Sequence, residues 1–203
     1  MSTPLELFEK HCAIAKCAGF VFTSNLPVGS KELMVCFDDG FRGIWDCKDR
    51  IASLGIRPTI FIAPGLIGKN GYLNWWEIKE LQDMGFVFQS HTYSHQRLTE
   101  VAESELLHEL RDARDYLSEK VGREVTQLCF PQGRFNEHVC NLALEYGYEL
   151  LYSSIPGDSS RRIFPSMVCR NLVQFATPRI YMAILNGGMD RLWKRYYKQH
   201  HVG

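Results

Sequence analysis

Two short polar motifs in the chain carry side chains that can act together chemically. Asp38 and Asp39 follow an apolar run that ends at Phe37, and His91 and His95 stand about fifty residues further on. Burying an unpaired carboxylate is costly, so two in a row indicate a cation or an open cleft. Histidines at i and i+4 lie on one face of a helical turn, where both imidazoles can face one point. One carboxylate and two imidazoles form a ligand set for Zn²⁺ or a similar divalent ion, and the second carboxylate stays free to act as a base.

Each motif alone has an ordinary structural explanation. The two aspartates could cap a following helix, and the two histidines could be surface residues. The combination is more specific, because a strand-like run precedes each motif, over 32–37 and 85–89. In α/β folds, catalytic groups gather at the carboxyl ends of strands. We therefore expect a site for metal-assisted hydrolysis, with the structural explanation as the alternative.

Strand-like and helical segments alternate along the chain. Apolar runs predict a strand ending at residue 37, strands over 58–63, 86–89, 128–130 and 149–153, and a weaker strand ending near residue 173. Helices are predicted over about 4–18, 41–54, 74–84, 102–121 and 137–146, and from residue 178 onward. Such β-then-α units imply parallel strands with right-handed crossovers. The expected fold is α/β, a distorted or incomplete (β/α) barrel of about six to seven parallel strands, with an open doubly wound sheet as the alternative.

The composition is that of an ordinary globular chain. With 203 residues, 45% of them hydrophobic and 23% charged, we expect a single domain over 1–203. The 23 basic and 23 acidic residues cancel, so no nucleic-acid partner is expected. Charges interrupt the amino-terminal apolar residues, which predicts no signal peptide, and no uncharged run reaches the ~18 residues of a transmembrane segment. Seven cysteines without a Cys-x-x-Cys pair fit a reducing compartment. We expect a cytoplasmic chain and make no prediction of its oligomeric state.

Three motifs of the chain, in their order and spacing, resemble a known family. Phe37–Gly40, His91–His95 and Phe130–Asn136 are similar to the first three motifs of the polysaccharide deacetylases, the NodB-homology domain of carbohydrate esterase family 4. Gly55–Ile62 is also similar to the second strand of that family. The resemblance covers roughly residues 33–153. It implies a distorted β/α barrel, a bound divalent metal that is often zinc, and removal of acetyl groups from N-acetylated sugars.

The resemblance also implies a role for individual residues. Asp39, His91 and His95 would hold one divalent metal ion, with Zn²⁺ as the first expectation and other divalent ions as alternatives. Asp38 would be the general base, because a metal lowers the pKa of bound water towards ~7 and a nearby carboxylate can then take its proton. The third motif would line the cleft, with the backbone N–H of Gln132 facing the oxyanion.

Two departures from the family pattern concern the catalytic groups. Many relatives place an arginine before the proline of the third motif, where it orients the base, but here that place holds Cys129 or Phe130. Arg134 and Arg170 are possible substitutes, and we include Arg134 among the expected catalytic residues with Asp38 and Gln132.

The second departure is the lack of an evident late histidine. Many relatives carry one as the general acid for the leaving amine. In this chain His138 is predicted to lie inside a helix, and His200 and His201 in a tail of no evident structure. We therefore expect that Asp38 returns the proton itself, that an unrecognised group does so, or that the acid has been lost.

The leading expectation for the function is a metal-dependent N-deacetylase. Its substrate would be an N-acetylated sugar of a polysaccharide or glycan precursor. One alternative is an amidohydrolase of a small ureide or imide, because the same barrel and metal could serve it, and substrate profiling separates the two. The other alternative is a non-catalytic glycan-binding module, suggested by the missing late histidine.

Overall fold

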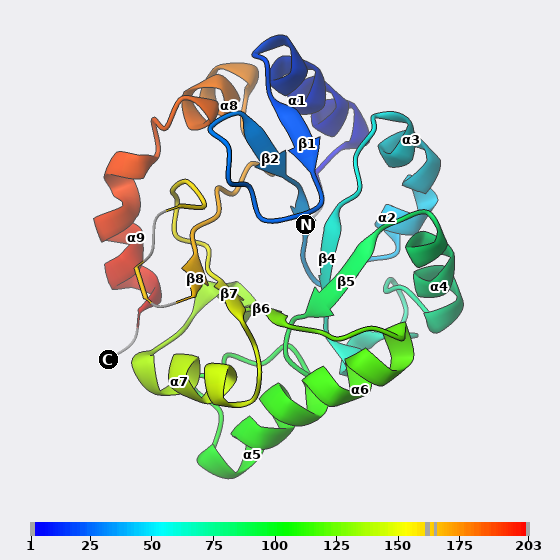
Figure 1. Ribbon diagram of the computed structural model, residues 1–203, viewed down its shortest axis with the longest axis vertical. Helices are drawn as coiled ribbons and strands as arrows, with labels where there is room; N and C mark the ends of the chain where they lie inside the picture. The colour runs from blue at the N-terminus through cyan, green and yellow to red at the C-terminus, as the bar shows by residue number, and fades with distance from the viewer. Residues whose placement is uncertain (1–2, 161–162, 165, 202–203) are drawn as a thin grey trace.

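A curled sheet of six parallel strands forms the centre of the computed structural model, which describes residues 3–160, 163–164 and 166–201. Helices surround this sheet (Figure 1). The strands are β3 (Cys36–Phe37), β4 (Thr59–Ile62), β5 (Val87–Ser90), β6 (Gln127–Cys129), β7 (Leu150–Tyr152) and β8 (Met167–Val168). Each pairs with the next strand in the sequence.

This strand order distinguishes between the two predicted architectures. A doubly wound sheet reverses its strand order at a switch point, whereas a barrel keeps each strand beside its successor. The order β3-β4-β5-β6-β7-β8 is the second kind. Within the described residues no strand pairing joins β3 to β8, so the sheet stays open between them. The prediction of an incomplete barrel is therefore confirmed.

The helices that follow β3 and β4 agree with the predicted segments, except that one predicted helix is divided in two. The predicted helix over 41–54 consists of α2 (Gly43–Asp46) and α3 (Lys48–Ser53), which are separated at Cys47, whose φ of −107° is not helical. The helix α4 (Trp75–Asp83) begins with a capping box between Asn74 and Glu77. Each helix places apolar side chains in the main core.

The longest predicted helix, over 102–121, contains a feature that was not predicted. It consists of α5 (Glu103–Leu107), a π-helical turn over His108–Asp112, and α6 (Ala113–Val121). Its apolar residues Leu106, Leu110, Ala113 and Leu117 are buried and form one face, while Leu107 is half-buried. The helix α7 (Glu137–Glu145) follows β6 as expected.

A small second sheet lies at one end of the molecule, in the upper half of Figure 1. Its strands β1 (Val21–Thr23) and β2 (Glu32–Met34) are parallel, and β1 was not predicted. The helices α1 (Leu5–Cys17) and α8 (Pro178–Leu185) lie side by side here (Figure 1). The ring of His11 stacks on Tyr181 with 4.3 Å between centroids. Among the described residues, no helix combines the length and apolarity needed to cross a membrane.

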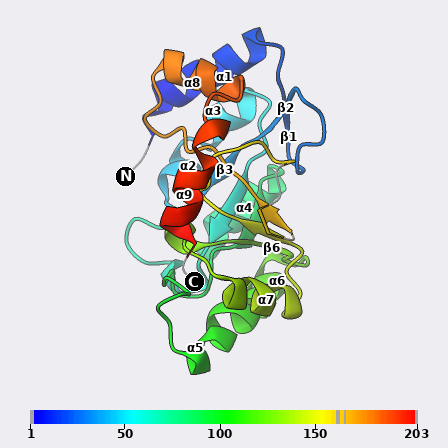
Figure 2. The same ribbon diagram turned by 90° about the vertical axis from the view of Figure 1, so that its left-hand side faces the viewer.

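The carboxyl-terminal histidines lie in ordered structure, so the prediction of a tail without structure was wrong. The helix α9 (Trp193–His200) lies along one side of the molecule and faces the viewer in Figure 2. The backbone N–H of Phe135 donates to the carbonyl oxygen of His200 at 3.2 Å, and His201 forms a β-bridge with Phe135. The sequence signal was weak because α9 packs through aromatic and histidine rings. Those rings include Tyr197, which stacks on His201 at 4.8 Å.

Candidate active site

The turn after β3 presents the two neighbouring carboxylates. Asp39 and Gly40 both have left-handed backbones, with φ of 72° and 71°. A side chain at Gly40 would collide with the core, because a Cβ there would lie 2.7 Å from Cγ2 of Ile62. The tight turn therefore requires glycine at this place. The side chains of Asp38 and Asp39 bind different partners from this turn, Arg170 for Asp38 and His95 for Asp39.

The two histidines converge on a loop after β5. The expectation of one helical turn was wrong, because residues 91–95 have no helical assignment and both Thr92 and His95 have positive φ, 64° and 65°. Non-glycine residues adopt this conformation only where the surrounding structure holds them. Here the N–H of His91 donates to the Ile62 carbonyl at 2.8 Å and that of His95 to Thr92 Oγ1 at 3.1 Å.

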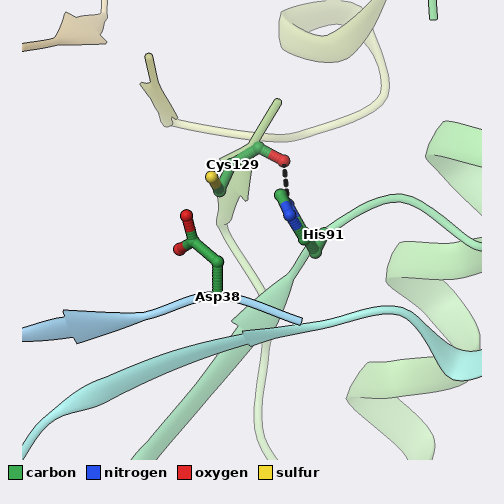
Figure 3. A group of neighbouring side chains, drawn as sticks. All are labelled: Asp38, His91 and Cys129. Carbon is green, nitrogen blue, oxygen red and sulfur yellow. Dashed lines mark hydrogen bonds between the residues drawn. The ribbon is translucent and has the colours of Figure 1, made fainter. Parts of the chain in front are cut away.

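Three donor atoms meet at one point, as the sequence predicted. Oδ1 of Asp39 lies 3.4 Å from Nε2 of His91 and 2.9 Å from Nε2 of His95. One donor atom from each of these three residues lies within 4.8 Å of the other two. The Nδ1 atom of His91 is bonded to the Cys129 carbonyl oxygen at 2.6 Å (Figure 3), which leaves its Nε2 free for a metal. One carboxylate and two imidazoles so arranged fit a divalent ion such as zinc.

The surroundings of Asp39 favour its ionised form. Burial alone would raise its pKa, but the hydrogen bonds and charge of His91 and His95 outweigh burial and lower the pKa well below the ordinary range. A ligand carboxyl group must lose its proton to bind a metal. Asp39 is therefore ready to bind a cation near neutral pH.

The second carboxylate, Asp38, is held by an arginine from the far edge of the sheet. Arg170 follows β8, and its Nη1 and Nη2 donate to the two carboxylate oxygens at 2.8 and 2.9 Å. Burial would raise the pKa of Asp38, but the guanidinium charge and hydrogen bonds lower it. Arg170 was one of two arginines considered for this role. No ion pair of the described residues links the other, Arg134, to Asp38.

A second group of possible ligands lies beside the first and fits a metal poorly. Asp38, His91 and Cys129 converge in Figure 3. However, Nη2 of Arg170 donates to Cys129 Sγ at 2.9 Å as well as to Asp38. Burial also raises the pKa of the Cys129 thiol well above its usual range, so the thiolate that a metal requires is disfavoured. A cation here would meet the arginine charge, so the better candidate for a metal is the group of Asp39, His91 and His95, called the metal group below.

The third motif forms a turn near the second one. Gln132 has a left-handed backbone, with φ of 57°, and no hydrogen bond found among the described residues takes up its backbone N–H. Its side-chain oxygen accepts a bond from Nε of Arg97 at 2.5 Å, which joins the motif to the histidine loop. Gly133 packs closely against Ser154 and His200, since a Cβ there would lie 2.6 Å from Ser154 Oγ.

The histidines outside the metal group occupy two different places. His138 lies on α7, is 55% exposed, and pairs with Glu103 at 2.9 Å, in agreement with its predicted place in a helix. His200 lies against the third motif, where burial lowers its pKa, the backbone of Gln132 partly opposes that shift, and the charge of Arg134 adds to the lowering. Its Nδ1 is buried, with no hydrogen-bond partner among the described residues. No pattern in the sequence indicated this packing.

The sequence analysis did not identify Glu109, a residue of the π turn whose carboxylate contacts the histidine loop. Glu109 is only 2% exposed, and it accepts bonds from the backbone N–H groups of Tyr93 and Ser94, both at 3.0 Å. A signal was present in the sequence. Glu109 stands three residues after Leu106 and next to Leu110, on the apolar face, where a carboxyl group requires a polar partner.

Comparisons with known proteins agree with this geometry. The family model described as polysaccharide deacetylase matches residues 25–151. A curated relative, the putative polysaccharide deacetylase YxkH of Bacillus subtilis, is 26% identical over 147 residues, which are 72% of this chain. The aligned part is 53% of that relative, so the chain spans about half its length.

Solved structures show the same fold. The Streptococcus pyogenes deacetylase PplD, solved with acetate, has a TM-score of 0.80 at 21% identity, over 89% of this chain and 86% of that one. A polysaccharide deacetylase from Bacillus cereus has a TM-score of 0.75 at 20% identity, over 87% of this chain and 61% of that one. The family model covers more than half of the chain and includes the metal group and Asp38. The chain therefore belongs to the polysaccharide deacetylase family.

Proposed function

We propose that this protein removes the acetyl group from an N-acetylated sugar of a polysaccharide or glycan precursor. One divalent ion, zinc in the first instance, would be held by Asp39, His91 and His95. The observation that carries the proposal is the convergence of these three donor atoms beside a second carboxylate, Asp38, which is paired with Arg170 and lies outside the group. The family of the chain supports the same activity.

The ion would supply Lewis acidity, which makes a water molecule more acidic and polarises the acetyl carbonyl group. Asp38 would accept a proton from the attacking water, and Arg170 would hold its carboxylate in one orientation for that task. The free backbone N–H of Gln132 would donate to the oxygen of the acetyl carbonyl as negative charge develops there.

Completion of the reaction requires a proton on the leaving nitrogen. We propose that Asp38 returns the proton that it took, so the C–N bond breaks to give acetate and a free amino sugar. The lowered pKa of His200 argues against a stored proton on that ring near neutral pH. Arg134 stays a predicted contributor, and its half-buried place in the third motif suits contact with substrate.

The cysteines of the described residues form no disulfide bond, which supports the cytoplasm as the proposed location. A glycan precursor is then a more accessible substrate than a finished polymer outside the cell.

The direct test is the release of acetate from metal-loaded protein. We expect N-acetylglucosamine oligomers to yield acetate and free amine in equal amounts, with Asp38→Asn as the inactive control. A metal-loaded wild type that binds the oligomers without hydrolysing them would instead support a binding module. Hydrolysis of a cyclic ureide, with no action on the oligomers, would support the small-molecule amidohydrolase.

A further inference from the structure

The carboxyl group of Glu109 is bound to the loop that carries the histidines. Its Oε2 accepts the backbone N–H groups of Tyr93 and Ser94, both at 3.0 Å, and its Oε1 accepts the Ser94 hydroxyl at 2.5 Å. Both residues that it binds lie between His91 and His95. Glu109 therefore fixes the middle of the segment whose two ends are proposed metal ligands.

The loop needs such acceptors because its backbone is strained. Thr92 and His95 flank the bound residues, and both have positive φ. Conformations of this kind cost about 1–3 kcal/mol for each non-glycine residue and persist only where the surrounding structure holds them. The carbonyl oxygen of Tyr93 is also fixed, by the N–H of Gly65 at 2.8 Å. Glu109 satisfies the donors of this segment, and Gly65 its acceptor.

The position of Glu109 depends on the π turn. The turn over His108–Asp112 interrupts a helix, and π turns of this kind occur frequently at functional sites. Glu109 is 2% exposed, yet no ion pair of the described residues includes it, so its hydrogen bonds to the loop are its polar contacts. Among the described residues, the side chain of Glu109 therefore makes its polar contacts with this loop.

A second contact joins the same turn to the strand before the loop. The Tyr148 hydroxyl lies 3.0 Å from the carbonyl oxygen of Leu110, to which it donates, and 2.8 Å from Ser90 Oγ. Ser90 ends β5 and directly precedes His91. The π turn is thus attached to both the start and the middle of the histidine segment.

We propose that Glu109 is a positioning residue that sets the metal affinity of the site. It would hold Tyr93 and Ser94 so that the imidazoles of His91 and His95 face Asp39 before any ion arrives. The proposal rests on the proposed function, since it requires that these three residues bind a divalent ion. Residues that orient metal ligands change affinity by about 10- to 100-fold when they are removed.

The test compares two substitutions of Glu109 by titrating metal-free protein with Zn²⁺ against a chelator. Glu109→Leu keeps the size of the side chain but loses every acceptor, and we expect zinc affinity to fall by about 10- to 100-fold. Glu109→Gln keeps one oxygen for the two backbone N–H groups, while its amide can donate to Ser94 Oγ. We expect its affinity to stay within about threefold of wild type.

A matched control separates positioning from general destabilisation. Glu77 is also 2% exposed and lies on a helix, but it bonds to Asn74 and Arg42, and no hydrogen bond or ion pair of the described residues joins it to the histidine loop. Glu77→Leu should lower the thermal unfolding temperature and leave zinc affinity unchanged. The absorption spectrum of the Co²⁺ form, which reports ligand geometry, should change in Glu109→Leu and stay constant in Glu77→Leu.

Each outcome decides between the possibilities. A folded Glu109→Leu with wild-type affinity and spectrum would overturn the proposal, and so would a Glu109→Gln as weak as Glu109→Leu, since charge would then matter more than the backbone bonds. If Glu109→Leu does not fold, Ser94→Ala removes one of the bonds and should weaken zinc binding by about two- to tenfold. Unchanged affinity there would count against Glu109. A wild type that binds no divalent ion would instead refute the proposed function.

Discussion

Two neighbouring residues, Asp38 and Asp39, face two sides of the site that are built differently. On the Asp39 side the partners are His91 and His95, whose imidazoles can bind a metal instead. On the Asp38 side the partner is Arg170, whose positive charge is permanent. One carboxylate therefore has partners that an ion can share, and the other has a partner that no ion can replace.

The difference shows how one turn assigns two tasks to identical side chains. Environment decides the chemistry of a carboxyl group, since burial, charge and hydrogen bonds each move its pKa. Both groups have a lowered pKa, but for different reasons, histidine contacts for Asp39 and the guanidinium for Asp38. Asp39 is thereby suited to hold an ion and Asp38 to accept a proton.

The largest effect is expected on the metal side. Asp39→Asn removes the only anionic ligand of the group, and we expect the zinc affinity to fall more than about 100-fold, with activity lost as well. Elemental analysis after dialysis, with Asp38→Asn as the control, measures this directly. Equal metal content in Asp39→Asn and wild type would show that the ion lies elsewhere.

The next effect separates the two carboxylates. Asp38→Asn should keep the metal and the fold but reduce hydrolysis by about 10²- to 10⁴-fold, the usual range for removal of a general base. Steady-state kinetics on metal-loaded protein provides the measurement. A rate within tenfold of wild type would mean that another group takes the proton.

A smaller effect is expected from Arg170→Gln. Charge-assisted hydrogen bonds contribute about 1.5–3 kcal/mol, so kcat/KM should fall roughly 10- to 100-fold. The guanidinium lowers the pKa of Asp38, and without it burial raises that pKa. Because the base works only when ionised, the acid limb of the kcat/KM profile should move to higher pH.

The lowered pKa of Asp38 also makes the stability of the folded protein depend on pH. A carboxyl group with a depressed folded-state pKa adds stability above its unfolded pKa of about 3.9 and loses it as the pH falls further. Arg170→Gln should therefore lose stability mainly above about pH 4, in thermal unfolding of the metal-free protein. An unmoved acid limb together with an unchanged stability profile would contradict this role of the pair.

The smallest effects are expected at the histidines outside the metal group. His138→Ala should leave kcat within about threefold, because this residue pairs with Glu103 on the surface. His200→Ala should cost less than about tenfold, through looser packing of the third motif, whereas loss of a true general acid costs about 10²-fold or more. A larger loss in folded, metal-loaded His200→Ala would identify His200 as the proton donor to the leaving amine.

The part of the site that the sequence predicted well is the part defined by short motifs after strands. Asp39, His91 and His95 met as expected, because parallel strands bring their carboxyl ends to one edge of the sheet. The strand order and the incomplete barrel followed from the alternation of strands and helices. What failed was local geometry. The spacing of His91 and His95 suggested a helical turn, but hydrogen bonds from outside the loop fix a different backbone.

The remaining contacts depend on distances along the chain that spacing cannot convey. Arg170 meets Asp38 across 132 residues, and the sequence could offer it only as one of two arginines. The buried place of His200 depends on packing between α9 and the third motif, for which no periodic pattern exists. Glu109 was recognisable as a polar residue on an apolar face, but only the π turn shows which loop it binds.

The ion pair between Asp38 and Arg170 joins residues that the ribosome adds to the chain at very different times. The three proposed metal ligands all belong to the first 95 residues, while Arg170 is added 75 residues after His95. The growing chain thus contains the residues proposed to hold the ion well before it contains the arginine that binds Asp38, the proposed base. During synthesis the proposed metal ligands are therefore complete first, and the partner of the proposed base is added last.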